Sequence, residues 1–570
     1  MAAPASPAEL DPPGEPVARD AARPAAPTGG PWRRLTVPGL WGALVFTLVS
    51  LTPSLLPRTA ITQGVLTGVS AAIGYGLGVL AAVIGRAFAD RGPRAPSPRS
   101  WQGLAVAAVV TLLPMLVLAR IWQNEVRDLM GAVHPPLWRL ALVPLVAALV
   151  FAALVGIGRL LLGVARWLGT WLARWMGARA ARALGAVVVA VLVTLVVSGL
   201  FVDGFIAVAD RVFATRDTGT HDDATQPTSE LRSGGPGSLI AWDSLGRQGR
   251  GLTGRGPSAE DIATVQGAPA ESPIRAYAGL ATAADTEERA RLAVDDLERA
   301  GGFDRAHLLV TTTTGTGWLD PGSMAAFEYV ARGDSAIVGL QYSFLPSWIS
   351  YLVDQPRARE AGRALFDEVY ERWTELPPEA RPRLYVTGES LGSFGMEAAF
   401  SGEADLRIRT DGALFTGPPR FNPLHQEFTQ GRDAGSPEIE PVYRDGRTVR
   451  FVSRIDQGIE PIEQPWEGTR VLYVQHPSDP IVWWGSELLL SRPEWLREPR
   501  GHDVTDTMRW YPLVTFWQVT LDMPFAVEVP DGHGHRYTAG SVDAWTTLLR
   551  PEGWTDADTD RVKRLIAPDE

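Results

Sequence analysis

The stretch RLYVTGESLGSFGMEAAF, residues 383–400, decides the fold. Its β-branched and aromatic residues predict a strand up to Gly388, and the residues after Gly392 predict a helix. The turn between them, GESLG, has the form G-x-S-x-G with Ser390 at its centre. In a nucleophile elbow, a serine stands on such a strand–turn–helix unit, and small neighbours let the backbone turn sharply. The alternative is a glycine-rich turn whose serine only caps the helix.

The segments around this turn also alternate between strand and helix patterns. An amphipathic helix is expected at 286–300 and a further helix near 356–375. Apolar strands joined by helices predict a parallel sheet covered on both faces, and we assign residues 238–570 to this domain. The other predicted strands are 273–280, 307–314, 336–343, 412–417 and 470–476.

A serine nucleophile needs a histidine and an acid, which follow the serine in this fold with the acid first. Asp479 comes directly after a predicted strand, and His533 and His535 lie in the glycine-rich loop PDGHGHRY. The histidine would take the proton of the Ser390 hydroxyl, and the aspartate would hold the imidazole tautomer. The alternative for Asp479 is an ordinary turn residue before Pro480.

Two neighbouring histidines compete for the role of base. We expect His533 to be the base, because Gly532 and Gly534 on either side let the loop bring its imidazole close to the elbow. His535 is the alternative, although we expect it to begin the segment that leads to the last helices. His476, three residues before Asp479, is the one serious competitor outside this loop.

Backbone amides must stabilise the oxyanion of such a reaction. The amide after the nucleophile, that of Leu391, is the first expected donor. The second donor is expected in the loop TTTTGTGWLDP, at Gly315, Thr316 or Gly317. A generic tight turn is the alternative for these three residues. The loop matches neither nucleotide-binding glycine motif.

Composition excludes several classes of function. The sequence has no cysteine, which rules out disulfides, thiolate catalysis and cysteine metal sites. A formal net charge of -11 disfavours nucleic acid as the main partner. The 8 histidines are sparse and no H-E-x-x-H motif occurs, so we expect neither a metal nor a cofactor.

The first part of the chain has the pattern of a membrane protein. Residues 1–35 read as a disordered cytoplasmic tail, and residues 36–210 as a transmembrane helical domain. Each apolar segment in it is near the ~20 residues that cross a bilayer, although buried helices of a soluble protein are the alternative. The five predicted spans are 38–56, 62–85, 103–119, 140–158 and 184–202.

The arginines of this region predict its orientation. They gather before the first span and in the loops 86–99 and 159–182, which share one side of a five-span protein. Because basic loops stay in the cytoplasm, the N-terminus is expected there. An odd number of spans then places the domain outside the cell membrane, after a polar linker at 211–237.

Several motifs together resemble a bacterial family of membrane-anchored alpha/beta-hydrolase-fold proteins with an N-terminal multi-helix membrane region. The resemblance covers nearly the whole chain after the tail. It implies the fold and a serine-hydrolase site at Ser390, Asp479 and the GHGH histidines, and it says little about the substrate. The motifs are LTPSLLPRTA (51–60), SLIAWDSLGRQGR (238–250), TGTGWLDP (314–321), QYSFLPSW (341–348), TGESLGS (387–393) and DGHGHRY (531–537).

The expected function is therefore a serine hydrolase that acts on an ester or thioester through an acyl-enzyme. An acyltransferase with the same triad, or a non-catalytic membrane scaffold or transport accessory, are the alternatives. Membrane lipids and an apolar acyl substrate are the expected partners, because aromatic residues crowd between the predicted acid and histidine. Core packing is the other explanation for those tryptophans, and the oligomeric state stays open. They are Trp483, Trp484, Trp495, Trp510 and Trp517.

Overall fold

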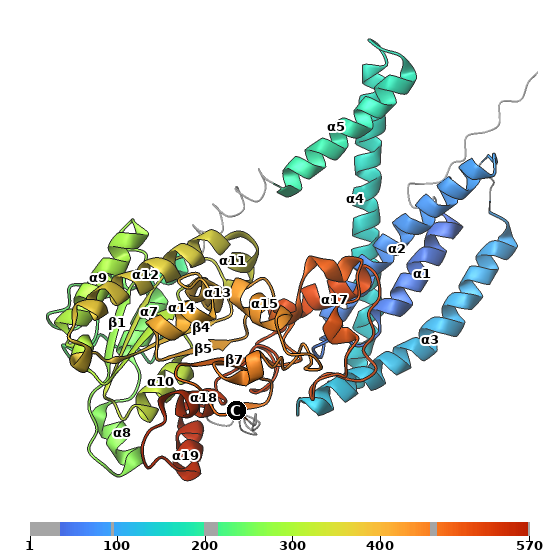
Figure 1. Ribbon diagram of the computed structural model, residues 1–570. Coiled ribbons are helices and arrows are strands. Elements are labelled where there is room, and N and C mark those ends of the chain that lie inside the picture. Colours follow the sequence, from blue (N-terminus) through green and yellow to red (C-terminus); the bar gives the residue numbers. More distant parts are fainter. Residues whose placement is uncertain (1–34, 93–95, 199–214, 456–463, 568–570) are drawn as a thin grey trace, which may run out of the picture.

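The computed structural model describes residues 35–92, 96–198, 215–455 and 464–567. A group of long helices, drawn in blue to cyan, lies beside an α/β domain drawn in green to red (Figure 1). The predicted tail lies almost wholly outside the described residues, as does the start of the predicted linker. The order of the two parts agrees with the sequence pattern.

A single parallel sheet forms the centre of the α/β domain. Its 7 strands have the order β1-β3-β2-β4-β5-β7-β6, and every neighbouring pair is parallel. The inner strands are buried along nearly their whole length, which explains their continuous apolar runs. The strands are β1 (Ile274–Ala278), β2 (His307–Thr312), β3 (Ser335–Leu340), β4 (Arg383–Glu389), β5 (Gly412–Thr416), β6 (Val449–Val452) and β7 (Arg470–Val474).

Helices cover both faces of this sheet. In Figure 1, α9, α12 and α13 lie on one face, and α10 and α18 lie on the other. The predicted α/β class with helices on both faces is therefore confirmed, and the short edge strand β6 is an addition to it. The main helices are α7 (Gly246–Gly254), α8 (Ala259–Gln266), α9 (Thr286–Arg299), α10 (Pro321–Val330), α11 (Ser347–Val353), α12 (Gln355–Glu375), α13 (Leu391–Glu397), α14 (Glu403–Arg409), α15 (Pro423–Gln430), α16 (Pro480–Trp483), α17 (Val514–Asp522), α18 (Ser541–Leu549) and α19 (Asp556–Ile566).

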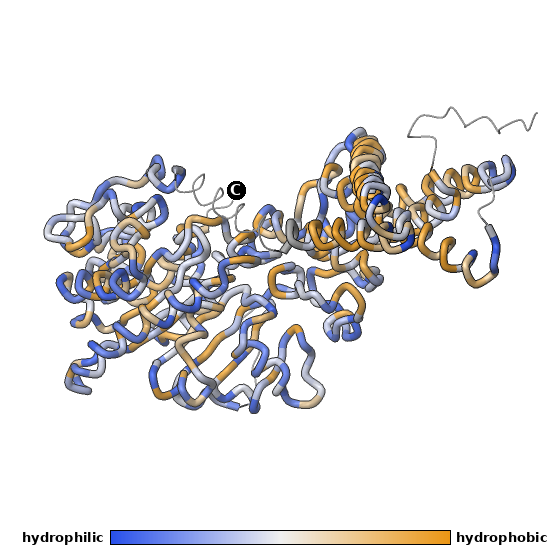
Figure 2. Tube along the Cα trace, turned by 90° about the horizontal axis from the view of Figure 1, so that it is seen from above, coloured by the Kyte–Doolittle hydropathy of each residue, from blue (hydrophilic) through white to orange (hydrophobic). Residues whose placement is uncertain are grey.

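Most described residues of each predicted apolar segment lie on a helix of the N-terminal part, although residues 51–56 of the first segment follow α1. Within the described residues, three helical stretches, 60–88, 98–129 and 137–172, are long and apolar enough to cross a membrane, which indicates membrane association. Hydrophobic residues dominate these helices (Figure 2). The predicted count of about five spans is not confirmed. The helices are α1 (Val37–Ser50), α2 (Ala60–Phe88), α3 (Pro98–Leu129), α4 (Leu142–Leu172, entered through the 3₁₀ turn Leu137–Ala141) and α5 (Ala178–Ser198).

Glycines let α1, α2 and α4 pack closely. A Cβ atom on Gly42 of α1 would lie 2.1 Å from the carbonyl oxygen of Gly74 on α2. A Cβ atom on Gly64 or Gly68 of α2 would lie 2.6 Å from the Cβ atom of a valine on α4. The helices approach to backbone contact at these points, as small residues allow in membrane bundles.

The segment between α1 and α2 docks the helices onto the α/β domain. The Arg58 guanidinium binds the Asp522 carboxylate at the end of α17, at 2.9 Å, and both side chains are only 1% exposed. The Ser54 hydroxyl donates to the same carboxylate at 2.6 Å. Leu55 and Leu56 join a buried apolar cluster with residues of the domain. The membrane helices and the domain therefore share one interface with a buried ion pair.

The predicted linker packs on the domain wherever it is described. The Asp217 carboxylate accepts a hydrogen bond from the Arg247 amide at 3.0 Å, and the Ser233 hydroxyl donates to Asp296 at 2.5 Å. The guanidinium of Arg232 donates to backbone carbonyls before α8. Residues 215–237 thus form specific contacts with the domain that they precede.

Candidate active site

Ser390 stands on a strained turn between β4 and α13. Its backbone angles are φ 54° and ψ -127°, a region that residues other than glycine rarely occupy. A Cβ atom on Gly388 would clash with the backbone of Gly392, and one on Gly392 would clash with the carbonyl oxygen of Thr312 on β2, so both flanking positions require glycine. Ser390 makes no side-chain capping bond to α13. This geometry is that of a nucleophile elbow and not of a helix-capping serine.

The Asp479 carboxylate contacts both the backbone of the following turn and the imidazole of a histidine. One of its carboxylate oxygens accepts the Ile481 amide at 2.8 Å and starts α16. The other lies 2.6 Å from Nδ1 of His535 and accepts the Tyr537 hydroxyl at 2.7 Å. Both readings of Asp479, as a turn residue and as the partner of a histidine, therefore describe the same side chain.

The histidine beside Asp479 is His535 and not the expected His533. Nδ1 of His533 lies 3.1 Å from the carboxylate of Asp503 instead. The glycine argument was incomplete, because Gly534 serves a different contact: its carbonyl oxygen lies 2.9 Å from Nδ1 of His476. That contact also engages His476, the competitor outside the loop.

His535 and Ser390 line the same cavity of about 520 Å³ at the carboxyl ends of the strands. The His535 ring packs so closely on Gly417, just after β5, that a Cβ atom there would lie 2.4 Å from it. The carbonyl of Thr416, one residue earlier, accepts the Ser390 amide at 2.9 Å. The end of β5 thus holds both residues. Nε2 of His535 is buried and has no hydrogen-bond partner within the described residues, so it is free to accept a proton.

The loop predicted to supply the second oxyanion amide follows β2, the strand next to β4. Thr316 and Ser390 line the same cavity. Leu391, directly after Ser390, is the first residue of α13. The Gly317 amide donates to the Thr314 carbonyl at 2.9 Å and is engaged in the turn itself. Gly315 and Thr316 therefore stay the predicted donors beside Leu391.

The cavity wall differs from the one that the tryptophan pattern suggested. None of the five tryptophans between Asp479 and the histidine loop lines it, although all five lie within the described residues. Trp483 and Trp495 are buried core residues, at 1% and 2% exposed. Trp318 and the apolar residues of the α17 region form the wall instead. The apolar residues that line the cavity include Tyr351, Ile481, Met523, Ala526 and Val527.

Two family matches now bear on this geometry. Residues 274–562 match the model of an alpha/beta-hydrolase family, and residues 51–257 match the model of the N-terminus of an alpha/beta-hydrolase family. The chain belongs to this alpha/beta-hydrolase family. No curated protein and no solved structure matches it. The N-terminal match begins in the segment between α1 and α2 and ends just after α7, a helix that contacts β1 of the sheet. In this hydrolase-family chain the two matches therefore cover the membrane helices and the α/β domain.

The alpha/beta-hydrolase site contains two carboxyl groups that sequence reasoning did not assign to it. Glu389, the variable residue before the serine, has an enclosed carboxyl group although the residue as a whole is partly exposed. Burial, followed by the charge of Asp320, raises its pKa to about 8. Burial also raises the pKa of Asp320, which accepts the Thr538 hydroxyl at 2.9 Å. The G-x-S-x-G motif leaves the residue before the serine open, and Asp320 lies outside that motif as the residue that caps the start of α10.

The surroundings of His535 in this alpha/beta-hydrolase site favour the charged form of its imidazole. Burial alone would lower the pKa of His535, but the charge of Asp479 and the hydrogen bond to it outweigh burial. The pKa of His535 is therefore raised above 6.5. Since an imidazolium forms when a histidine takes the proton of a serine, this environment stabilises the product of that proton transfer.

Proposed function

We propose that this protein is a membrane-associated serine hydrolase that cleaves an ester or thioester through an acyl-enzyme. One observation carries the proposal: Ser390 on its strained elbow and His535 on Asp479 line a single cavity. The chain order of serine, aspartate and histidine is also that of the alpha/beta-hydrolase triad.

The proposed reaction begins with proton transfer. Nε2 of His535 takes the proton of the Ser390 hydroxyl while Oγ of Ser390 attacks the carbonyl carbon of the substrate. The amides of Leu391 and of Gly315 or Thr316 would stabilise the resulting oxyanion. The imidazolium returns the proton to the leaving alcohol or thiol, and an acyl-serine remains. Water then attacks the acyl-serine by the same proton route and releases the acid.

An apolar acyl group suits the cavity best. Its wall contains Met523 and Ala526, and both also belong to the apolar cluster that includes Leu55 and Leu56 of the docking segment. The cavity proposed to bind the acyl group and the segment between α1 and α2 therefore contact the same side chains, those of Met523 and Ala526. This arrangement supports a substrate drawn from membrane lipids, which reach water poorly.

Active-site labelling tests the nucleophile. Full-length protein in detergent is treated with a fluorophosphonate probe beside Ser390→Ala and the matched control Ser401→Ala, whose serine is exposed. Labelling is expected in the wild type and the control and absent in Ser390→Ala. Labelling that persists in Ser390→Ala, or that fails in the wild type, contradicts the proposal; the second result favours a non-catalytic scaffold. Medium and long p-nitrophenyl esters are expected to react faster than acetyl esters, and the reverse order would exclude a lipid substrate.

We further propose that the catalytic domain faces the outside of the cell membrane. The absence of cysteine makes the test clean, because any single introduced cysteine is the sole thiol. Ser401→Cys on the domain and Gly92→Cys beyond α2 are both exposed positions. In intact cells, a maleimide that cannot cross membranes is expected to label the first and not the second. The opposite labelling would reverse the orientation.

A further inference from the structure

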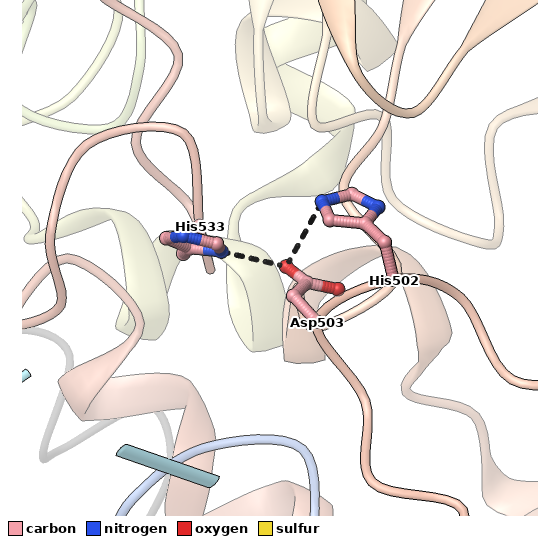
Figure 3. Close-up of side chains that lie close together, drawn as sticks. All are labelled: His502, Asp503 and His533. Carbon is pink, nitrogen blue, oxygen red and sulfur yellow. Dashed lines mark hydrogen bonds and ion pairs between the residues drawn. The ribbon is translucent and has the colours of Figure 1, made fainter. Parts of the chain in front are cut away.

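A second cluster of histidines and a carboxylate lies beside the catalytic loop. It contains His502, Asp503 and His533, and the carboxylate of Asp503 lies between the two imidazole rings (Figure 3). One carboxylate oxygen is 3.1 Å from Nδ1 of His533 and 4.0 Å from Nε2 of His502. None of the three residues lines the cavity of Ser390. The proposed reaction does not use this cluster.

The donor atoms have the spacing of a metal site. All three lie within 4.8 Å of one another. Ligand atoms around a tetrahedral zinc ion are about 3.3 Å apart, given metal–ligand distances near 2.0 Å. The contact between Asp503 and His533 already has this spacing. The His502 side chain is 21% exposed, and its Nε2 stands 4.0 Å from the carboxylate oxygen.

The buried carboxylate supplies an independent reason for a cation. Asp503 is 0% exposed, and one of its oxygens takes the Ser478 hydroxyl at 2.5 Å together with His533. Its other oxygen, Oδ1, is buried without a hydrogen-bond partner within the described residues. A buried, unpaired carboxylate oxygen is costly, and native proteins rarely leave one. The distances to both histidines are measured to the bonded oxygen, Oδ2, so a cation at this spacing satisfies Oδ1 when the carboxylate binds it through both oxygens. A plain hydrogen bond between His533 and Asp503 leaves Oδ1 without a partner.

We propose that His502, Asp503 and His533 bind a divalent transition-metal ion of the zinc type, with water in the fourth position. A donor set of two imidazoles and one carboxylate favours zinc over magnesium or calcium, which prefer oxygen ligands alone. The sequence predicted no metal because no local motif joins these residues: His533 lies 30 positions after Asp503.

The ion would tie two loops together next to the catalytic histidine. His533 is two residues from His535, and Ser478 is adjacent to Asp479. The Ser478 hydroxyl also accepts the Gly534 amide at 2.8 Å, so Asp503 and Ser478 already brace the loop between the two histidines. The ion would strengthen this brace and hold the loop, and it takes no part in the acyl chemistry.

Cobalt titration of the full-length protein tests the site. The protein is purified in detergent without a polyhistidine tag, treated with a chelator and titrated with Co²⁺ and then Zn²⁺. One equivalent of Co²⁺ is expected to give the visible absorption bands of a near-tetrahedral site, and Zn²⁺ is expected to abolish them. Absence of stoichiometric binding would overturn the proposal.

Variants identify the ligands. His502→Ala and His533→Ala are expected to weaken Co²⁺ binding at least tenfold, whereas His134→Ala, which removes an exposed histidine 2.7 Å from Asp128, leaves it unchanged. His502→Ala keeps the bond between Asp503 and His533, so the fold is retained, and thermal unfolding of the metal-free protein checks this. Unchanged binding in His502→Ala overturns the site. Ser390→Ala is expected to bind Co²⁺ as the wild type does, which separates this proposal from the catalytic one.

Discussion

Two histidine–aspartate pairs, only two residues apart on one loop, differ in what lies beyond the imidazole. In both pairs Nδ1 faces a fully buried aspartate, at 2.6 Å for His535 and 3.1 Å for His533, and a hydroxyl also binds each aspartate. His535 lines the cavity of the elbow serine and leaves its Nε2 without a hydrogen-bond partner within the described residues, whereas His533 lies beside another histidine. The same local chemistry therefore predicts a base in one case and a ligand in the other, and the surroundings decide between them.

The largest expected effect comes from removing the group that distinguishes the two pairs. Ser390→Ala is expected to lower kcat for a p-nitrophenyl ester by about 10⁴-fold or more, because no neighbouring group replaces the attacking oxygen. Thermal unfolding is expected to stay near that of the wild type, since alanine fits the turn as serine does. Activity that survives in this variant would remove the difference between the two pairs.

Replacing each histidine with alanine in turn tests the comparison directly. His535→Ala is expected to lower kcat by about 10³- to 10⁴-fold, because the base and the imidazolium are both lost. His533→Ala is expected to lower it by less than about tenfold, through the loop alone. Both variants are assayed side by side at saturating substrate. An inactive His533→Ala beside an active His535→Ala would restore the expectation drawn from the glycines.

The hydroxyl groups that bind the aspartates sharpen the comparison further. Tyr537→Phe removes a hydrogen bond of 2.7 Å to Asp479, and a bond to a charged acceptor contributes about 1.5 kcal/mol or more. We expect kcat/KM to fall roughly tenfold. Ser478→Ala, which removes the corresponding bond to Asp503, is expected to change kcat/KM less. Equal losses in the two variants would show that the two pairs serve catalysis alike.

The pH profile gives the smallest effect. His535 must be neutral to accept a proton, and its pKa is raised above 6.5, so the acid limb of kcat/KM is expected to have its midpoint above pH 6.5. At pH 6.5 more than half of the sites are protonated, and activity lies below half of its plateau. His533→Ala is expected to leave the midpoint in place. A midpoint below pH 6.5, or one that moves with His533, contradicts the assignment.

What could be predicted from the sequence was local. The strand, the GESLG turn and the following helix lie within residues 383–400, so neighbouring residues determine them. The order of the alternating strands and helices likewise follows from apolar periodicity, and the elbow serine and the position of Asp479 follow from that order.

What could not be predicted depends on contacts between distant residues. Asp479 and His535 are 56 positions apart, and Asp503 and His533 are 30 apart, so a choice between adjacent histidines depends on how two separate loops meet. The contacts of residues 215–237 could not be predicted for a similar reason: serine, aspartate and arginine look the same in a free chain and in one that bonds to a domain. Burial alone distinguishes core tryptophans such as Trp483 from cavity residues.

The buried ion pair between Arg58 and Asp522 has a consequence for the biogenesis of the protein. The two residues are separated by 464 positions, so a ribosome adding ~5–20 residues per second makes the second roughly half a minute to a minute and a half after the first. During that interval the guanidinium cannot be buried without a counter-ion, which is strongly unfavourable. The segment between α1 and α2 must therefore stay hydrated until the α17 region arrives. Docking of the helices onto the domain through this ion pair is thus a late step of biogenesis, and a chain that stops before α17 leaves Arg58 without its counter-ion.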